Sequence, residues 1–348
     1  MSNQKIMARK KTTIAKIAEE AGLSTATVDR VLNNRPGVNA ETEEKVKRAL
    51  AELGGAAPQR GRPRQRPNYR FAYVLPATRF AFFDSVDRHI AQSASAFRDQ
   101  HITEVTHRLD TGDVNLLAQE LARFDHYDGI ALLAPDLPQV KLAVNQLVSA
   151  GVHAVTIFSD VSGCMRETFV SADNRAAGRT AGLLLGRMLP YRKKLQVAVF
   201  SQSTRFSADI DRRVGFAQIH EERFPWLEVL RMTELPESEE EALAASRAFL
   251  ADKPLLSGIY NVGSCTFGIS RAVNELGAKR RIPIVGHDLT ETTRALLLSG
   301  EIAYVLNEDI RYCILTAARA LRALCDNLRG ALGVVQPRIE ILTSENLT

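Results

Sequence analysis

The first fifty residues contain two short amphipathic helical segments around a tight turn, and this pattern constrains the fold more than any other part of the chain. Apolar residues recur at three- and four-residue spacing from Ile14 to Ala21, which places them on one face of a helix. Gly22 supplies the left-handed backbone conformation that ends such a helix. Ser24 is suited to cap a second helix. The apolar face of that second helix consists of Val28, Val31 and Leu32.

A third helix is predicted after Val38, with Asn39 as its cap. Its buried stripe consists of Val46, Leu50 and Leu53. The second helix leaves its polar side chains facing outward, and a helix supported by a neighbour in this way fits the major groove of DNA. The alternative is that the three helices form an ordinary bundle with no role in DNA binding.

Positive charge is concentrated in the same part of the chain. Residues 1–70 contain fifteen lysines and arginines and seven acidic residues, a surplus of +8. The whole chain carries +5, so the remaining residues carry about −3. A basic surplus confined to the predicted helix-turn-helix fits contact with DNA phosphates and release of their counterions. The charge distribution therefore favours DNA binding over an ordinary bundle.

The run from Thr13 to Asn33, continued by Val38-Asn39-Ala40-Glu41-Thr42, resembles the lactose repressor and galactose repressor (LacI/GalR) family of bacterial transcription regulators. Residue types agree across the turn and into the third helix. The resemblance implies that one set of residues faces base edges, namely Thr25, Ala26 and Arg30. It implies that a second set contacts phosphates, namely Thr13, Ser24, Thr27 and Asn33.

Asp29 belongs to the same predicted DNA-binding surface, at a position where relatives usually have serine. A carboxylate there would repel phosphates unless it accepts a hydrogen bond from a cytosine amino group or pairs with Arg30 or Arg35. Of these two arrangements we favour the intramolecular pair, which is an ordinary exposed ion pair.

Residues 56–69 are predicted to be a basic linker between a DNA-binding domain at 1–55 and a second domain at 70–348. Relatives commonly carry a short hinge helix here, but three prolines and three glycines in residues 54–68 disfavour a helix. Two interpretations stay open. The segment is either an extended basic arm along the DNA or a solvated tether.

From Arg70 onward, short apolar runs alternate with amphipathic helical segments. The predicted strands are 71–75, 129–133, 154–158, 196–200, 258–260 and 282–286. The predicted helices are 85–98, 115–124, 139–150, 175–188, 212–223, 239–250 and 266–276. Alternation of this kind predicts an α/β domain with parallel sheets covered on both faces. About 275 residues exceed what one core supports, so we expect two lobes, and the resemblance implies a periplasmic-binding-protein architecture.

Open parallel sheets bind ligands at the carboxyl ends of their strands. The loops predicted there combine aromatic rings with carboxylates, amides and a guanidinium. Rings stack on the apolar faces of a sugar while the polar groups satisfy its hydroxyls, so these loops predict a site for a sugar or polyol. The candidate residues from the loops are Phe82, Phe83, Asp160, Asp173, Asn174, Arg212, Asn261 and Asp288.

The resemblance implies effector-binding roles for Arg212, Asn261 and Asp288, and for Asp173 or Asn174. It adds Glu308, which stands where relatives often have glutamine. A carboxylate only accepts hydrogen bonds, so this exchange favours a polyol or a cationic ligand. The alternative for the loop residues is a helix cap or a hydrogen bond between lobes, a role for which Asp173, Asn174 and Ser159 are equally suited.

The remaining motifs point away from catalysis. The four cysteines lack metal-binding spacing and the histidines are scattered, so no metal, cofactor or catalytic residue is predicted. No secretory or membrane-spanning segment is recognised, and we expect reduced thiols, a cytoplasmic protein and no membrane partner.

The prediction is a transcriptional regulator, expected to be a repressor, that binds double-stranded operator DNA as a homodimer under control of a small effector. The alternative is a sugar-handling enzyme or a transport-type binding protein with a basic tail. A transport receptor would need an export signal, and an enzyme would need a paired acid and base in the cleft.

Overall fold

The computed structural model describes residues 13–32, 38–53, 68–78, 80–97, 101–191, 194–202, 204–232, 235–277, 281–328 and 333–347. The chain forms two compact units that divide between Pro67 and Asn68. Most of the predicted linker, residues 56–67, lies outside the described residues. Its last residue, Tyr69, begins the first strand of the second unit, because the apolar run starts there rather than at Phe71.

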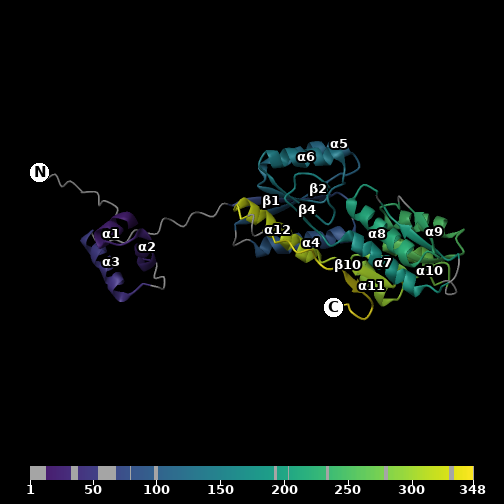
Figure 1. The fold of residues 1–348 in the computed structure, drawn as a ribbon. Helices are drawn as coiled ribbons and strands as arrows, with labels where there is room; N and C mark the ends of the chain where they lie inside the picture. Colours follow the sequence, from purple (N-terminus) through teal and green to yellow (C-terminus); the bar gives the residue numbers. More distant parts are fainter. Residues whose placement is uncertain are drawn as a thin grey trace. The chain divides into compact units, whose positions relative to one another are not determined.

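The first unit contains the predicted helix-turn-helix (Figure 1). Its helices are α1 (Ile14–Ala21), α2 (Thr25–Leu32) and α3 (Ala40–Glu52). Gly22 ends α1 with a φ of 65°, and the Ser24 hydroxyl caps α2 by accepting a hydrogen bond from the Thr27 N–H at 3.1 Å. The small core formed by the three helices is Ile17, Ala18, Val28, Val46 and Ala49. The predicted helices, caps and apolar faces are confirmed.

The second unit contains two lobes, each built on a mainly parallel sheet. The first sheet has the order β2-β1-β3-β4-β5. Its strands are β1 (Tyr69–Pro76), β2 (Ile102–Leu109), β3 (Gly129–Leu132), β4 (His153–Ile157) and β5 (Thr168–Val170). One face of this sheet packs against α4 (Ala81–Ala96) and α12 (Ile310–Cys325). The other face packs against α5 (Val114–Leu121) and α6 (Pro138–Ser149). A 3-10 turn at Ala122–His126 follows α5.

The second sheet has the order β11-β10-β9-β8-β6-β7, in which β11 runs antiparallel to β10. Its strands are β6 (Gln196–Phe200), β7 (Glu228–Met232), β8 (Leu256–Asn261), β9 (Ile284–His287), β10 (Tyr304–Asn307) and β11 (Glu340–Leu342). On one face lie α7 (Asn174–Met188) and α8 (Ser207–Arg223). On the other lie α9 (Glu239–Leu250), α10 (Thr266–Asn274) and α11 (Glu291–Leu298). The predicted two lobes with covered parallel sheets are confirmed.

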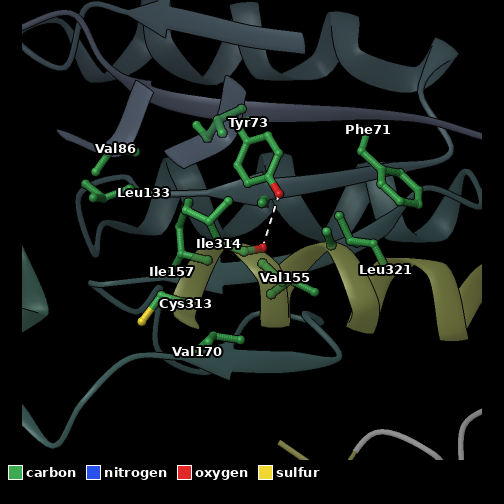
Figure 2. Close-up of a cluster of buried hydrophobic side chains, with 14 of the residues drawn as sticks. Phe71, Tyr73, Val86, Leu133, Val155, Ile157, Val170, Cys313, Ile314 and Leu321 are labelled. Atoms are coloured by element: carbon green, nitrogen blue, oxygen red, sulfur yellow. Dashed lines mark hydrogen bonds between the residues drawn. The ribbon is translucent and has the colours of Figure 1, made fainter. Parts of the chain in front are cut away.

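Helix α12 returns the chain from the second lobe to the first, before β11 adds to the second sheet. The chain enters the second lobe after β5 and leaves it after β10, so α12 lies against the first sheet. Figure 2 shows Cys313, Ile314 and Leu321 of α12 packed against the side chains of that sheet. The Tyr73 hydroxyl donates a hydrogen bond to the Ile314 carbonyl at 3.3 Å across this contact.

Several elements differ from the sequence-based expectation. Strands β2, β5, β7, β10 and β11 were not predicted, and four of them lie at sheet edges, where a strand needs no continuous apolar run. Helix α8 begins at Ser207 rather than Arg212, so Arg212 lies within a helix instead of a loop. In the part of the chain that the structure describes, no helix is long and apolar enough to cross a membrane.

Candidate functional site

A cleft between the two lobes holds a cavity of about 130 Å³ at the carboxyl ends of the parallel strands. The first lobe contributes Pro76, Thr78, Phe80, Phe82, Phe83, Thr111, Leu133, Phe158 and Ser159. The second contributes Gln202, Phe206, Ala208, Asp209, Arg212, Glu237, Gly263, Ser264, Asp288 and Glu308. Because both lobes line the cavity, a ligand bound there would contact both at once.

Arg212 is buried at the centre of this site, on the second turn of α8. Its Nε donates to Asn174 Oδ1 at 2.7 Å and its Nη1 donates to the Val262 carbonyl at 2.9 Å. Asn174 is held in turn because its Nδ2 donates to the Phe158 carbonyl at 3.2 Å. These contacts fix the guanidinium before any ligand arrives.

Three carboxylates surround the Arg212 guanidinium: Asp209, Asp288 and Glu308. Burial raises the pKa of Asp209 to about 6, against the lowering influence of Arg212. Burial also raises the pKa of Asp288 and of Glu308, and Arg212 again opposes the shift. For Arg212 itself burial disfavours the charge, but the carboxylates, with Asp288 foremost, keep its pKa above the ordinary value. The site is therefore an ionic cluster in which Arg212 and Glu308 are buried and Asp209 and Asp288 partly buried, with more acids than bases among the described residues.

Glu308 also joins the two lobes. One oxygen, Oε1, accepts a hydrogen bond from the Ala172 N–H, which lies where the chain crosses into the second lobe. The same oxygen accepts from the Cys313 thiol at 3.4 Å, at the start of α12. Glu308 is thus both a wall of the cavity and a link between two crossover segments.

Aromatic rings form another part of the cavity lining, here called the aromatic wall. The Phe82 ring packs edge-on against Phe83 and against Phe158, with ring centroids 5.3 Å apart in each pair. Phe80 stacks on Phe83 at 6.2 Å, and Phe206 completes the wall from the second lobe. A lining that combines aromatic rings with hydrogen-bonding groups suits a molecule with apolar faces and a polar edge.

The structure brings together some of the residues predicted for the effector site and separates others. Among the described residues that line the cavity are Phe82, Phe83, Arg212, Asp288 and Glu308. The other four predicted residues, Asp160, Asp173, Asn174 and Asn261, are not part of that lining.

Each of those four residues has a partner within the protein. Asp160 pairs with Arg166 and accepts a hydrogen bond from the Thr156 hydroxyl at 2.7 Å. Asp173 caps α7 by accepting a hydrogen bond from the Ala176 N–H at 2.9 Å. This is the helix-cap role that the sequence predicts as the alternative to effector binding.

Asn174 and Asn261 act beneath the surface of the cavity. Asn174 positions Arg212, as described above. Asn261 is fully buried, and its Nδ2 donates to the carbonyls of Gly263 and Ser264 and to Thr266 Oγ1. It therefore shapes the loop that lines the cleft instead of lining the cleft itself.

Sequence reasoning missed Asp209, because the segment before Arg212 was expected to be a loop. Asp209 and Arg212 are three residues apart in α8, a spacing that places both on one helix face. Recognition that the helix begins at Ser207 would have brought the two together.

The predicted DNA-binding residues lie along one region of the first unit. Thr13, Ser24, Thr25, Ala26 and Arg30 are exposed, while Thr27 and Asp29 are partly buried. Ser24 and Thr27 share a hydrogen bond of 2.8 Å between their hydroxyls. Asn33 and Arg35 lie outside the described residues, so neither the phosphate contact of Asn33 nor the pairing of Asp29 with Arg35 is tested.

A helix-turn-helix unit followed by a two-lobed domain with a cleft is the domain arrangement of ligand-responsive transcriptional regulators. Residues 13–54 match the family described as bacterial regulatory proteins, lacI family, and residues 71–330 match the periplasmic binding protein domain. The chain belongs to the periplasmic binding protein domain family over residues 71–330, and residues 13–54 form a helix-turn-helix domain of the lacI family type.

Relatives with similar sequences are also regulators. The transcriptional regulator MalR of Streptomyces coelicolor is 29% identical over 202 residues, which span 53% of this chain and 57% of that protein. AglR of Rhizobium meliloti is 25% identical over 79% of this chain and 77% of its own length. The regulator reg1 of Streptomyces lividans is 53% identical over 53 residues, which are 15% of each chain.

Solved structures share the two-lobed fold. GanP, a glucose-galactose binding protein from Geobacillus stearothermophilus, superposes with a TM-score of 0.71 at 17% identity, covering 81% of this chain and 99% of that one. A solute binding protein from Burkholderia graminis in complex with D-arabinose gives a TM-score of 0.71 at 19% identity, covering 82% and 98%. At these identities the likeness establishes the fold.

Proposed function

We propose that this regulator binds a sugar or polyol in the cleft, and that the bound effector changes how its helix-turn-helix unit binds double-stranded operator DNA. The observation that carries the proposal is the pair of carboxylates beside Arg212. None of the described residues donates a hydrogen bond to the side chain of Asp209 or Asp288, although both line the cavity. Both carboxylates are partly buried, and carboxylate oxygens that receive no donor from the protein can accept hydrogen bonds from the hydroxyl groups of a polyol.

The aromatic wall and the comparisons support the same class of effector. Phe82 adds aromatic surface to the cavity that the carboxylates line, and the buried Phe83 ring packs against it, so the lining combines apolar and hydrogen-bonding groups as a site for a pyranose or furanose ring does. Two proteins that share the fold are a glucose-galactose binding protein and a complex with D-arabinose.

On the DNA side, we propose a homodimer that places two copies of α2 in successive major grooves of a pseudo-palindromic operator in the cytoplasm. The exposed residues Thr25, Ala26 and Arg30 would then reach base edges, while Thr13, Ser24 and Thr27 would contact phosphates. An effector alters this binding only if it prefers one arrangement of the two lobes over the other.

A thermal-shift panel of sugars and polyols tests the cleft. A ligand that binds only the folded protein stabilises it by about 2.7 kcal/mol at one hundred times its Kd, so a true effector raises the melting temperature. The increase should disappear in Asp288→Ala and persist in Glu240→Gln, which removes an exposed carboxylate of α9. Equal increases in the parent and in Asp288→Ala would contradict the assignment of the cleft.

Operator binding then tests the coupling. The compound that stabilises the protein most should change its affinity for DNA from its own upstream region at a fixed salt concentration. An affinity that is the same with and without that compound would contradict effector control.

A further inference from the structure

A second cavity opens beside the first in the same cleft. It measures about 510 Å³, and it shares Phe80, Phe82, Glu237, Gly263, Ser264 and Asp288 with the first cavity. Sites for small molecules usually measure roughly 300–1,000 Å³. The first cavity, at about 130 Å³, is below that range, whereas the second lies within it. A ligand of the usual size that contacts Arg212 in the first cavity would therefore extend into the second.

Hydroxyl side chains line the part of the second cavity that lies beyond the shared wall, and of these Ser238, Thr290 and Thr292 are partly exposed, whereas Thr266 and Thr293 are buried and bonded within the protein. These hydroxyls come from the beginnings of three helices in the second lobe: Ser238 at α9, Thr266 at α10, and Thr290, Thr292 and Thr293 at α11. Phe267 adds an aromatic side chain that is 40% exposed. Hydroxyls next to an aromatic ring form a second surface of the kind that binds a sugar ring.

The electrostatics of the second cavity disfavour a negatively charged ligand. Helix beginnings usually attract anions, but here the protein already occupies their donors. Ser238 accepts from the Glu241 N–H at 3.2 Å, Thr290 accepts from the Thr293 N–H at 3.2 Å, and Glu239 Oε2 accepts from the Gly268 N–H at 2.7 Å. The carboxylates of Glu237, Glu239 and Asp288 add negative charge to the lining.

From the two joined cavities we infer that the effector is an uncharged molecule of two linked rings, such as a disaccharide or another glycoside. One ring contacts Arg212, Asp209 and the aromatic wall, and the second ring contacts Phe267 and the hydroxyls at the beginnings of α9 and α11. The inference rests on the proposed function and narrows the class of its effector.

Titration calorimetry on the full chain tests the size and charge of the ligand. The probes are the disaccharides maltose, cellobiose, lactose, sucrose and trehalose, the monosaccharides glucose, galactose and fructose, and trehalose 6-phosphate as an anionic counterpart of trehalose. We expect at least one disaccharide to bind about tenfold or more tightly than either of its component monosaccharides. We expect trehalose 6-phosphate to bind no more tightly than trehalose.

A substitution that fills the second cavity tests where the second ring binds. Thr292→Trp places a large side chain in that cavity, at a position for which no hydrogen bond is recorded among the described residues. We expect Thr292→Trp to weaken binding of the tightest-binding disaccharide by about tenfold or more, while the affinity for monosaccharides stays within about twofold of the parent. Glu291→Trp is the matched control, because Glu291 is the neighbouring exposed residue of α11 and lies outside the lining of both cavities.

The outcomes separate this inference from the proposed function. A monosaccharide that binds more tightly than every disaccharide would overturn the two-ring effector and leave a sugar-controlled regulator intact. The two-ring effector would also be overturned if Thr292→Trp bound the disaccharide as tightly as the parent does. Tighter binding of trehalose 6-phosphate than of trehalose would overturn the inference that the effector is uncharged. If no sugar of either size binds, the proposed function fails together with the inference.

Discussion

A Cβ atom on Gly178 would lie 1.8 Å from the carbonyl oxygen of Arg212, so the backbones of α7 and α8 touch at the residue that anchors the cleft. Gly215 makes the reciprocal contact, since its Cβ would lie 2.0 Å from the Arg175 carbonyl. Two glycines on facing helices therefore set how far the Arg212 side chain reaches into the cavity.

Gly178→Ala should destabilise the protein and weaken effector binding. In an ordinary helix the change from glycine to alanine adds stability, by about 0.5–1 kcal/mol. Here the methyl group would overlap the backbone of Arg212, and overpacking of this kind costs about 1–3 kcal/mol. Urea denaturation measures the loss, and an increase in stability would show that the helices separate freely. Gly333→Ala is the control, because a Cβ at Gly333 meets no atom within 4 Å.

Asn174→Ala and Asp173→Ala should have different effects although the two residues are adjacent. Asn174→Ala removes the acceptor at 2.7 Å from Arg212 Nε, so we expect a loss of about 1–3 kcal/mol in stability and weaker effector binding. Asp173→Ala removes only the cap of α7, which costs about 1 kcal/mol and leaves effector affinity unchanged. Calorimetry with the best ligand of the sugar panel, together with urea denaturation, distinguishes the two. Similar affinities for both variants would show that Asn174 does not position Arg212.

Asp209 should make the stability of the protein depend on pH. Its pKa rises from 3.8 to about 6 on folding, so the folded state binds the additional proton between these values. The contribution of Asp209 to the free energy of unfolding is therefore most favourable at acid pH and is lost as the pH rises through about 6. Asp209→Asn removes the cost of burying an ionised carboxylate. We expect the free energy of unfolding of the variant to exceed that of the parent by at most about 3 kcal/mol at pH 7.5, with a smaller difference at pH 5.

Melting temperatures of the parent, Asp209→Asn and Glu240→Gln at both pH values check this expectation. Glu240 is an exposed carboxylate of α9 outside the cleft, so its variant should follow the parent. A difference between Asp209→Asn and the parent that is the same at pH 5 and pH 7.5 would argue against titration of Asp209. Effector affinity should fall in Asp209→Asn even though stability rises, since the variant lacks the charged acceptor.

Arg30→Ala should weaken specific DNA binding and relax the preferred sequence. Arg30 is exposed on α2, and a side chain that reads a base edge contributes about 1–3 kcal/mol of discrimination. Lys45→Ala on α3 is the comparison, because Lys45 pairs with Glu41 at 3.0 Å and has no predicted base contact. Binding to operator and to scrambled DNA at one salt concentration measures the effect. Unchanged affinity and unchanged sequence preference would remove Arg30 from the residues that read bases.

Much of the protein follows from residues that are close together in the sequence. The caps formed by Ser24 and Asn39 and the αL residue Gly22 each depend on backbone groups within a few positions, so the helix-turn-helix could be predicted almost completely. The buried strands β1, β3, β4 and β6 were also predictable, because a strand covered on both faces requires a continuous apolar run.

What only the tertiary structure decided is which polar residues reach the cleft. Asp160 and Asp288 both follow buried strands, yet Asp160 is neutralised by Arg166 whereas Asp288 faces Arg212. Arg166 lies six residues after Asp160, but their spacing alone does not show that the side chains pair, and Arg212 is far from Asp288 in the sequence, so the outcome depends on which charged group the fold brings alongside each carboxylate. Local hydrogen bonds and periodicity specify the elements of this chain, and long-range packing specifies the partners that make a binding site.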